Sequence, residues 1–194
     1  MNTQNFKPIK WSWEEIFQKQ RELKFMYEPE ARELFDNFDI DCLEDQELFK
    51  KYCWRITEEF VEAMEADTMR EITHLQEELI DALNFSIELM LLCGMGPDKL
   101  ICSFKNPSSY FGSRNKDFTT VCIYHLGLTA NCLKNRQWRR SQYLVDMIKF
   151  DLYFGQYLSA LKDYLFKVFK SDEQIRRAWS LKYQVNMFRI QTNY

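Results

Sequence analysis

Glycine and proline are scarce in this chain, whose 194 residues include five glycines and four prolines. Folds built from many short strands need frequent tight turns, and those turns depend on these two residue types. Long stretches with helical periodicity run between the few breakers. The scarcity therefore argues against an all-β fold, and we predict an all-α helical bundle that forms one domain over residues 1–194.

The chain also lacks a C-x-x-C pair, a strong excess of one charge and a long apolar run. Its six scattered cysteines indicate free thiols in a reducing cytoplasm rather than a disulfide framework or a zinc site. The formal net charge is −3, so no overall field attracts nucleic acid or a membrane. Residues 89–93, the longest apolar run, are too few to cross a bilayer, and the N-terminus lacks the apolar core of a signal peptide. We expect a cytoplasmic protein without a membrane partner.

Apolar periodicity predicts the principal helices. Ser12, followed three residues later by Glu15, matches a capping box at the start of the first one. Residues 28–46 are expected to hold a short helix and a connection, and residues 191–194 a mobile polar tail. The principal helices are expected at residues 11–26, 46–67, 77–94, 118–134, 142–169 and 172–188.

The stretch at residues 77–94 is apolar nearly all the way round a helical wheel. Because a helix of this kind is buried, any carboxylate on it must be paired or bind a metal. Glu78 and Asp81 stand three apart and project from one face, which predicts the wall of a site. The alternative is a solvated acidic face, the commoner meaning of this spacing in isolation. The polar stripe consists of His74, Glu78, Asp81, Asn84 and Glu88.

A second acidic pair, Glu59 and Glu62, lies on the preceding predicted helix. A short connection makes consecutive helices antiparallel neighbours, so four carboxylates can converge from two facing helices. Oxygen ligands without His or Cys suit Mg²⁺ or Mn²⁺ rather than zinc. Because Mg²⁺ held in this way usually keeps waters and takes further ligands from substrate phosphates, the set indicates phosphate chemistry.

E-x-x-E followed by E-x-x-D on the next helix resembles the all-α nucleotide pyrophosphohydrolases, the superfamily of dimeric dUTPases, phage dCTPase–dUTPases and MazG-like proteins. The run E-L-I-D from Glu78, then Asn84-Phe85 and C-G-M-G, is similar to the E-L-I-D…H-F…G-L-G segment of the phage enzymes. Asn84 stands where that segment often has His. Trp54 ahead of the first acidic pair, and Gln20 in Q-R-E-L, resemble the corresponding sequence motifs of dimeric dUTPases.

The C-terminus resembles the family ending L-K-x-x-x-N-x-x-R-Q-x-x-G-Y. Ile190 and Asn193 depart from the family glutamine and glycine, which leaves the exact contacts open but keeps the cations. The resemblance covers about residues 12–100 and 178–194, so residues 101–177 are interpreted as a divergent insertion of additional helices. The matching residues are Leu181, Lys182, Asn186, Arg189 and Tyr194.

The resemblance implies a hydrolase that cleaves a deoxynucleoside triphosphate, dUTP and/or dCTP, to the monophosphate and pyrophosphate with Mg²⁺ or, as its substitute, Mn²⁺. It implies a homodimer and Glu59 as the general base. Because surplus aromatic residues are enriched at interfaces, we expect the dimer to use part of residues 118–170. The choice of base, and whether diphosphates are cleaved, stay open. The implied metal ligands are Glu59, Glu62, Glu78 and Asp81, and the implied substrate-binding residues are Gln20, Trp54, Asn84, Lys182, Asn186, Arg189 and Tyr194.

Two functions of other classes compete with this hydrolase. A phage-type protein of the same fold, acting in the host cytoplasm, could bind a regulatory protein partner without catalysis. A nucleic-acid module could use the basic cluster around Trp138, in residues 134–140, although one such cluster in an acidic chain is weak evidence. For Gln20 the alternative to a ligand contact is a satisfied amide in the core.

Overall fold

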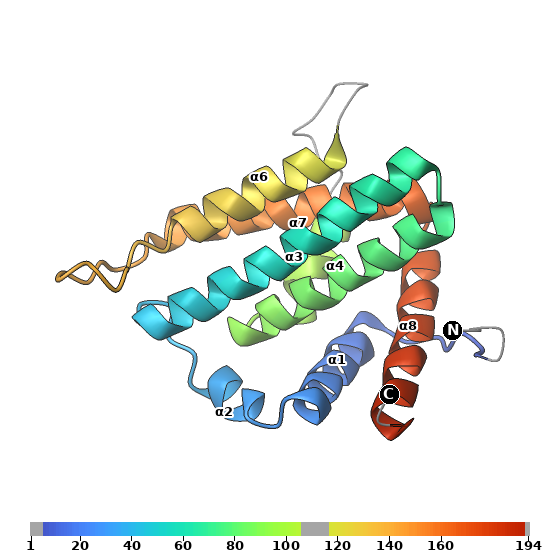
Figure 1. Ribbon diagram of the computed structural model, residues 1–194, viewed down its shortest axis with the longest axis horizontal. Helices are drawn as coiled ribbons and strands as arrows, with labels where there is room; N and C mark the ends of the chain where they lie inside the picture. The colour runs from blue at the N-terminus through green and yellow to red at the C-terminus, as the bar shows by residue number, and fades with distance from the viewer. Residues whose placement is uncertain (1–5, 106–116, 193–194) are drawn as a thin grey trace.

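The computed structural model describes residues 6–105 and 117–192, without the side chains of residues 103–105. The described residues form eight helices and no strand (Figure 1), which confirms the predicted all-α fold. The helices are α1 (Trp13–Tyr27), α2 (Ala31–Asp36), α3 (Leu43–Met69), α4 (Ile72–Leu92), α5 (Pro97–Lys105), α6 (Phe118–Asn131), α7 (Met147–Phe169) and α8 (Asp172–Thr192).

Helices α3 and α4 pack side by side as an antiparallel hairpin (Figure 1). Arg70 ends α3 in the left-handed conformation, with φ 61, and its N–H bonds back to the last turn of the helix. The amide of Glu71 also returns to the carbonyl of Ala66, at 2.9 Å. This tight reversal places the second half of α3 against the first half of α4, where the two acidic pairs lie.

Helices α6 and α7 form a second hairpin that lies along α3 (Figure 1). Aromatic residues of α7 fill the space between the hairpins: the rings of Tyr157 and Phe60 pack edge to face with centroids 6.4 Å apart. The Tyr157 hydroxyl also lies 2.5 Å from Ser86 Oγ on α4, so that buried polar pair is satisfied. Helix α4 is thus enclosed, as its apolar sequence predicts.

Helix α8 lies at one end of the bundle, where it packs on α1 and α4 and runs steeply across their direction (Figure 1). The capping box of α1 is confirmed, because Ser12 and Glu15 exchange both hydrogen bonds. Trp13 Nε1 donates to Asp172 Oδ1 at 2.8 Å and joins the start of α1 to the start of α8. These contacts fix the position of α8 relative to α1 and α4, so that Lys182 and Arg189 lie beside α4.

Several predicted helix boundaries are wrong, among them the start of α4, which lies at Ile72 rather than at 77. Helix α8 continues through Thr192, so the residues after Arg189 are not a non-helical tail; Thr192 Oγ1 bonds to the carbonyl of Phe188 at 2.8 Å within the helix. Helix α7 begins at Met147 rather than near 142 because Val145 N–H donates to Asp41 Oδ1 at 2.7 Å, which holds the preceding segment off the helix. Within the described part of the chain, no helix combines the length and apolar content needed to cross a membrane.

Candidate active site

Three carboxylates meet where α3 faces α4. Glu59 comes from α3 and Glu78 and Asp81 from α4, and one ligand oxygen of each lies within 4.8 Å of the others. Glu78 is buried, while Glu59 and Asp81 are half-buried. The spacing of three residues puts Glu78 and Asp81 one turn apart on a single face, as the sequence predicts.

The cluster carries more negative charge than its surroundings neutralise. Burial, with the nearby Asp81 and Glu78 charges, raises the pKa of Glu59 to about 8. Burial also raises the pKa of Glu78 and of Asp81, although Lys182 opposes the shift of Asp81. A divalent cation held between these oxygens would relieve the repulsion, and an all-oxygen set is the kind that Mg²⁺ or Mn²⁺ prefers. The residues present therefore fit such an ion, and Glu59, Glu78 and Asp81 would be its ligands.

Glu62 lies outside this group of three. It is exposed, one turn further along α3 on the side of Glu59, and its charge contributes to the raised pKa of Glu59 and Glu78. Two basic side chains border the cluster instead. His74 Nε2 lies 2.8 Å from Glu78 Oε1, and Lys182 Nζ bonds to Asp81 Oδ2. Of the four predicted carboxylates, the structure therefore brings three together and leaves Glu62 at their margin.

A pocket of about 430 Å³ opens beside the carboxylates, between α1, α3, α4 and α8. Its volume lies in the range of small-molecule sites. Seven predicted site residues line it, and they come from four helices, α1, α3, α4 and α8. These are Gln20, Glu59, Asp81, Asn84, Lys182, Asn186 and Arg189.

Comparisons with known protein families, curated proteins and solved structures find no match for this chain.

Trp54 does not line the pocket. Its side chain is 64% exposed, and its Nε1 donates to Glu58 at 2.8 Å. Five residues separate Trp54 from Glu59, about 140° around a helix, whereas Arg55 lies one turn before Glu59 on the same face. Arg55 accordingly lines the pocket, with its guanidinium 5.3 Å from the centroid of the Phe85 ring. Tyr194, the other predicted aromatic cover, lies outside the described residues.

The inner end of the pocket is polar and buried. Gln20 Nε2 donates to Glu88 Oε1 at 2.8 Å, and Lys24 Nζ lies 3.5 Å from Glu88 Oε2 and 2.8 Å from Glu28 Oε1. Burial raises the pKa of Glu88, and Lys24 and Gln20 oppose that shift. Gln20 is therefore an amide bound to a buried carboxylate at the pocket wall.

The sequence interpretation missed several lining residues. Glu88 belongs to the polar stripe of α4, and Lys24 lies one turn beyond Gln20, so helical spacing was the signal for both. Tyr27 lies on the same face of its helix as Gln20, but its hydroxyl lies 3.3 Å from the carbonyl of Asn186 on α8, a contact that helical spacing does not indicate. Periodicity identifies faces of one helix but not which helix will cover them.

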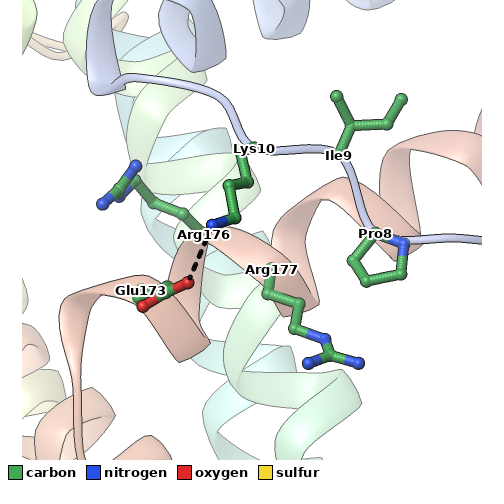
Figure 2. A pocket seen from close by; sticks show the side chains of 6 residues that line it. All are labelled: Pro8, Ile9, Lys10, Glu173, Arg176 and Arg177. Atoms are coloured by element: carbon green, nitrogen blue, oxygen red, sulfur yellow. Dashed lines mark ion pairs between the residues drawn. The ribbon is translucent and has the colours of Figure 1, made fainter.

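A second hollow, of about 300 Å³, lies at the start of α8 (Figure 2). Its charged side chains are already engaged: Lys10 points to Glu173 at 3.7 Å, and Arg176 donates to the carbonyl of Trp11 at 2.6 Å. Arg177 points away from the Lys10 pair in Figure 2. Without a convergent set of polar groups, this hollow offers no site comparable to the pocket beside the carboxylates.

Proposed function

We propose that this chain hydrolyses a pyrimidine deoxynucleoside triphosphate to the monophosphate and pyrophosphate with Mg²⁺ or Mn²⁺. One observation carries the proposal: the carboxylates of α3 and α4 share a pocket with Lys182, Asn186 and Arg189 of α8. A cation-binding cluster next to two cationic side chains suits a substrate with both metal-bound and free phosphate oxygens. The resemblance to all-α nucleotide pyrophosphohydrolases supports the same reaction and the deoxynucleotide class.

The reaction assigns a role to each end of this pocket. The ion, when bound to Glu59, Glu78 and Asp81, supplies Lewis-acid polarisation of phosphate oxygens and of water. Glu59 accepts the proton of the attacking water. Lys182 and Arg189 balance the charge that develops on the phosphate oxygens. Gln20 and Asn84 face the nucleoside.

Homodimerisation and a reducing cytoplasm belong to the same proposal. The start of α7 and the segment before it expose apolar side chains, with Leu144 84% and Ile148 85% exposed. Exposed apolar surface typically marks an interaction site where it gathers in one patch, and both of these side chains fall within residues 118–170. All six cysteines are free thiols, which suits a reducing compartment.

The direct test is a panel of deoxynucleoside triphosphates and diphosphates with purified protein, with pyrophosphate and monophosphate measured together. We expect equimolar release of both products in Mg²⁺ and none in excess EDTA. Glu59→Gln should lower kcat by at least about 100-fold, because a positioned proton acceptor is lost. Glu65→Gln, the same change at an exposed position of α3, should leave kcat unchanged. Absence of pyrophosphate from every triphosphate, with Mg²⁺ and with Mn²⁺, would refute the activity and favour a partner-binding protein of this fold.

A further inference from the structure

Gln20, one of the residues that line the pocket, has an amide oxygen that no donor satisfies. The side chain is 3% exposed, and its nitrogen is occupied by Glu88 at 2.8 Å. Its Oε1 is buried and has no hydrogen-bond partner. A buried acceptor without a donor is costly, so this oxygen points to a ligand that brings an N–H or O–H group.

Asn84, one turn before Glu88 on α4, repeats the arrangement. Its side chain is 7% exposed, and its Nδ2 donates to Asp81 Oδ1 at 3.3 Å. Its Oδ1 is buried and also lacks a hydrogen-bond partner. The side-chain amides of Gln20 and Asn84 therefore each donate to a carboxylate through their nitrogen, and each has an amide oxygen without a hydrogen-bond partner.

The carboxylates determine which way these amides face. An ionised carboxylate only accepts hydrogen bonds, so an amide beside it must present its NH₂ group and turn its oxygen elsewhere. Lys24, paired with Glu88 Oε2 at 3.5 Å, stabilises the ionised form of Glu88. Rotating the Gln20 amide by half a turn would set its oxygen against Glu88 Oε1. Glu88 thus holds Gln20 as an acceptor.

We propose that the base end of this pocket selects an amino-bearing pyrimidine, so that cytosine is preferred over uracil and thymine. This inference depends on the proposed nucleotide hydrolysis. The 4-amino group of cytosine offers two N–H donors, one for each of two unpartnered oxygens. Uracil and thymine carry a carbonyl oxygen at C4 instead, and that oxygen would face two acceptors. Their only ring N–H donor on this edge is at N3. Glu88 acts through Gln20 as a positioning residue for base choice.

The wild-type protein provides the first test, with kcat/KM measured for dCTP, dUTP, dTTP and dATP. We expect dCTP to exceed dUTP and dTTP by at least about tenfold, because sites built from fixed hydrogen-bonding groups discriminate strongly against a mismatched partner. Equal or better use of dUTP or dTTP would overturn the inference while leaving the hydrolysis in place. Equal use of dATP would overturn its restriction to pyrimidines.

Binding separates this inference from the proposed reaction. The α,β-imido analogues of dCTP and dUTP are not cleaved at that bond, so their dissociation constants can be compared by calorimetry even if turnover is absent. Tighter binding of the dCTP analogue without hydrolysis of dCTP would support base choice and refute the reaction. Equal binding of the two analogues would refute base choice, as would failure of both to bind.

The variant Glu88→Gln tests the positioning role. A neutral amide can donate as well as accept, so Gln20 becomes free to turn its NH₂ group towards the base. We expect the dCTP to dUTP ratio of kcat/KM to fall at least about fivefold, towards one. Glu173→Gln, the same change at the exposed partner of Lys10 (Figure 2), should keep the parent ratio. A Glu88→Gln protein with the parent circular dichroism and melting temperature, but an unchanged ratio, would exclude the role of Glu88.

Discussion

Lys182 Nζ donates a hydrogen bond to Asp81 Oδ2 across 101 positions of the chain. Both side chains are 20% exposed, so the pair lies at the pocket wall rather than on the open surface. The bond joins α8 to the acidic cluster and places a cation where the proposed phosphates would lie. In the metal-free protein the same cation offsets part of the charge that the cluster concentrates.

Replacing each partner of this pair should have different effects on stability. Lys182→Met leaves a half-buried carboxylate without its cationic partner and should lower the free energy of unfolding by about 1–3 kcal/mol. Asp81→Asn removes one of the repelling carboxylates, so the metal-free variant should be as stable as the parent or more stable, because burial already raises the pKa of Asp81. Urea denaturation in EDTA measures both.

The same two variants should lose activity together. Each removes a group proposed to act on the phosphates or the ion, and we expect kcat to fall at least about 100-fold for either one. Helix content measured by circular dichroism should stay at the parent level. Asp81→Asn with full turnover, or with large destabilisation, would mean that this stripe of α4 is structural.

The metal-free protein should become less stable as pH rises. The pKa of Glu59 is about 8 in the folded protein against 4.5 ordinarily, so its protonated form is favoured by folding. This contribution is fully present below about pH 4.5 and is lost as pH approaches 8; Glu78 and Asp81 shift in the same direction. The melting temperature in EDTA should therefore fall between pH 5 and pH 8. Mg²⁺ should raise it more at pH 8 than at pH 5.

Glu59→Gln provides the control for this pH profile. It removes the group with the largest shift in the cluster, so the variant should show a flatter decline in melting temperature and a smaller gain from Mg²⁺. Parent and variant profiles that coincide, with and without Mg²⁺, would argue against both the raised pKa and the ion site.

Arg189 should matter more to catalysis than the residues after it. It lines the pocket, and its Nε is buried without a hydrogen-bond partner, which suits a phosphate that the metal-free protein lacks. Arg189→Ala should lower kcat/KM by more than tenfold. Deletion of residues 191–194 should cost at least about tenfold, roughly 1.4 kcal/mol of transition-state binding. A truncated enzyme with the parent kcat and KM would place those residues outside the site.

The protein should be a homodimer at micromolar concentration. Leu144, Ile148 and Leu152 succeed one another at intervals of four and are 84%, 85% and 52% exposed, which is unusual for large apolar side chains of a monomer. Light scattering should give twice the chain mass of 23.6 kDa, and Ile148→Glu should give the single mass with the parent helix content. A monomeric parent would contradict the dimer, and a dimeric Ile148→Glu would place the interface elsewhere.

Local spacing determined much of this protein before any tertiary contact was known. The capping box of Ser12 and Glu15 and the common face of Glu78 and Asp81 depend on residues three apart, which a helix always brings together. The enclosure of α4 followed from its apolar circumference, because water cannot solvate such a helix. The acidic cluster was predictable for a different reason: a short turn makes α3 and α4 neighbours, which brings their carboxylates together.

Tertiary packing alone decided the partners that lie on other helices. Helical spacing from Glu59 already separates Arg55 from the exposed Trp54, but the contact of the Arg55 guanidinium with the Phe85 ring depends on how α3 packs against α4. The bond from Gln20 to Glu88, and that from Lys182 to Asp81, depend on how α1 and α8 cross α4. A helical period specifies the face on which a residue lies. The angle and register at which two helices meet arise from the packing of many side chains at once, and no single stretch of sequence carries that information.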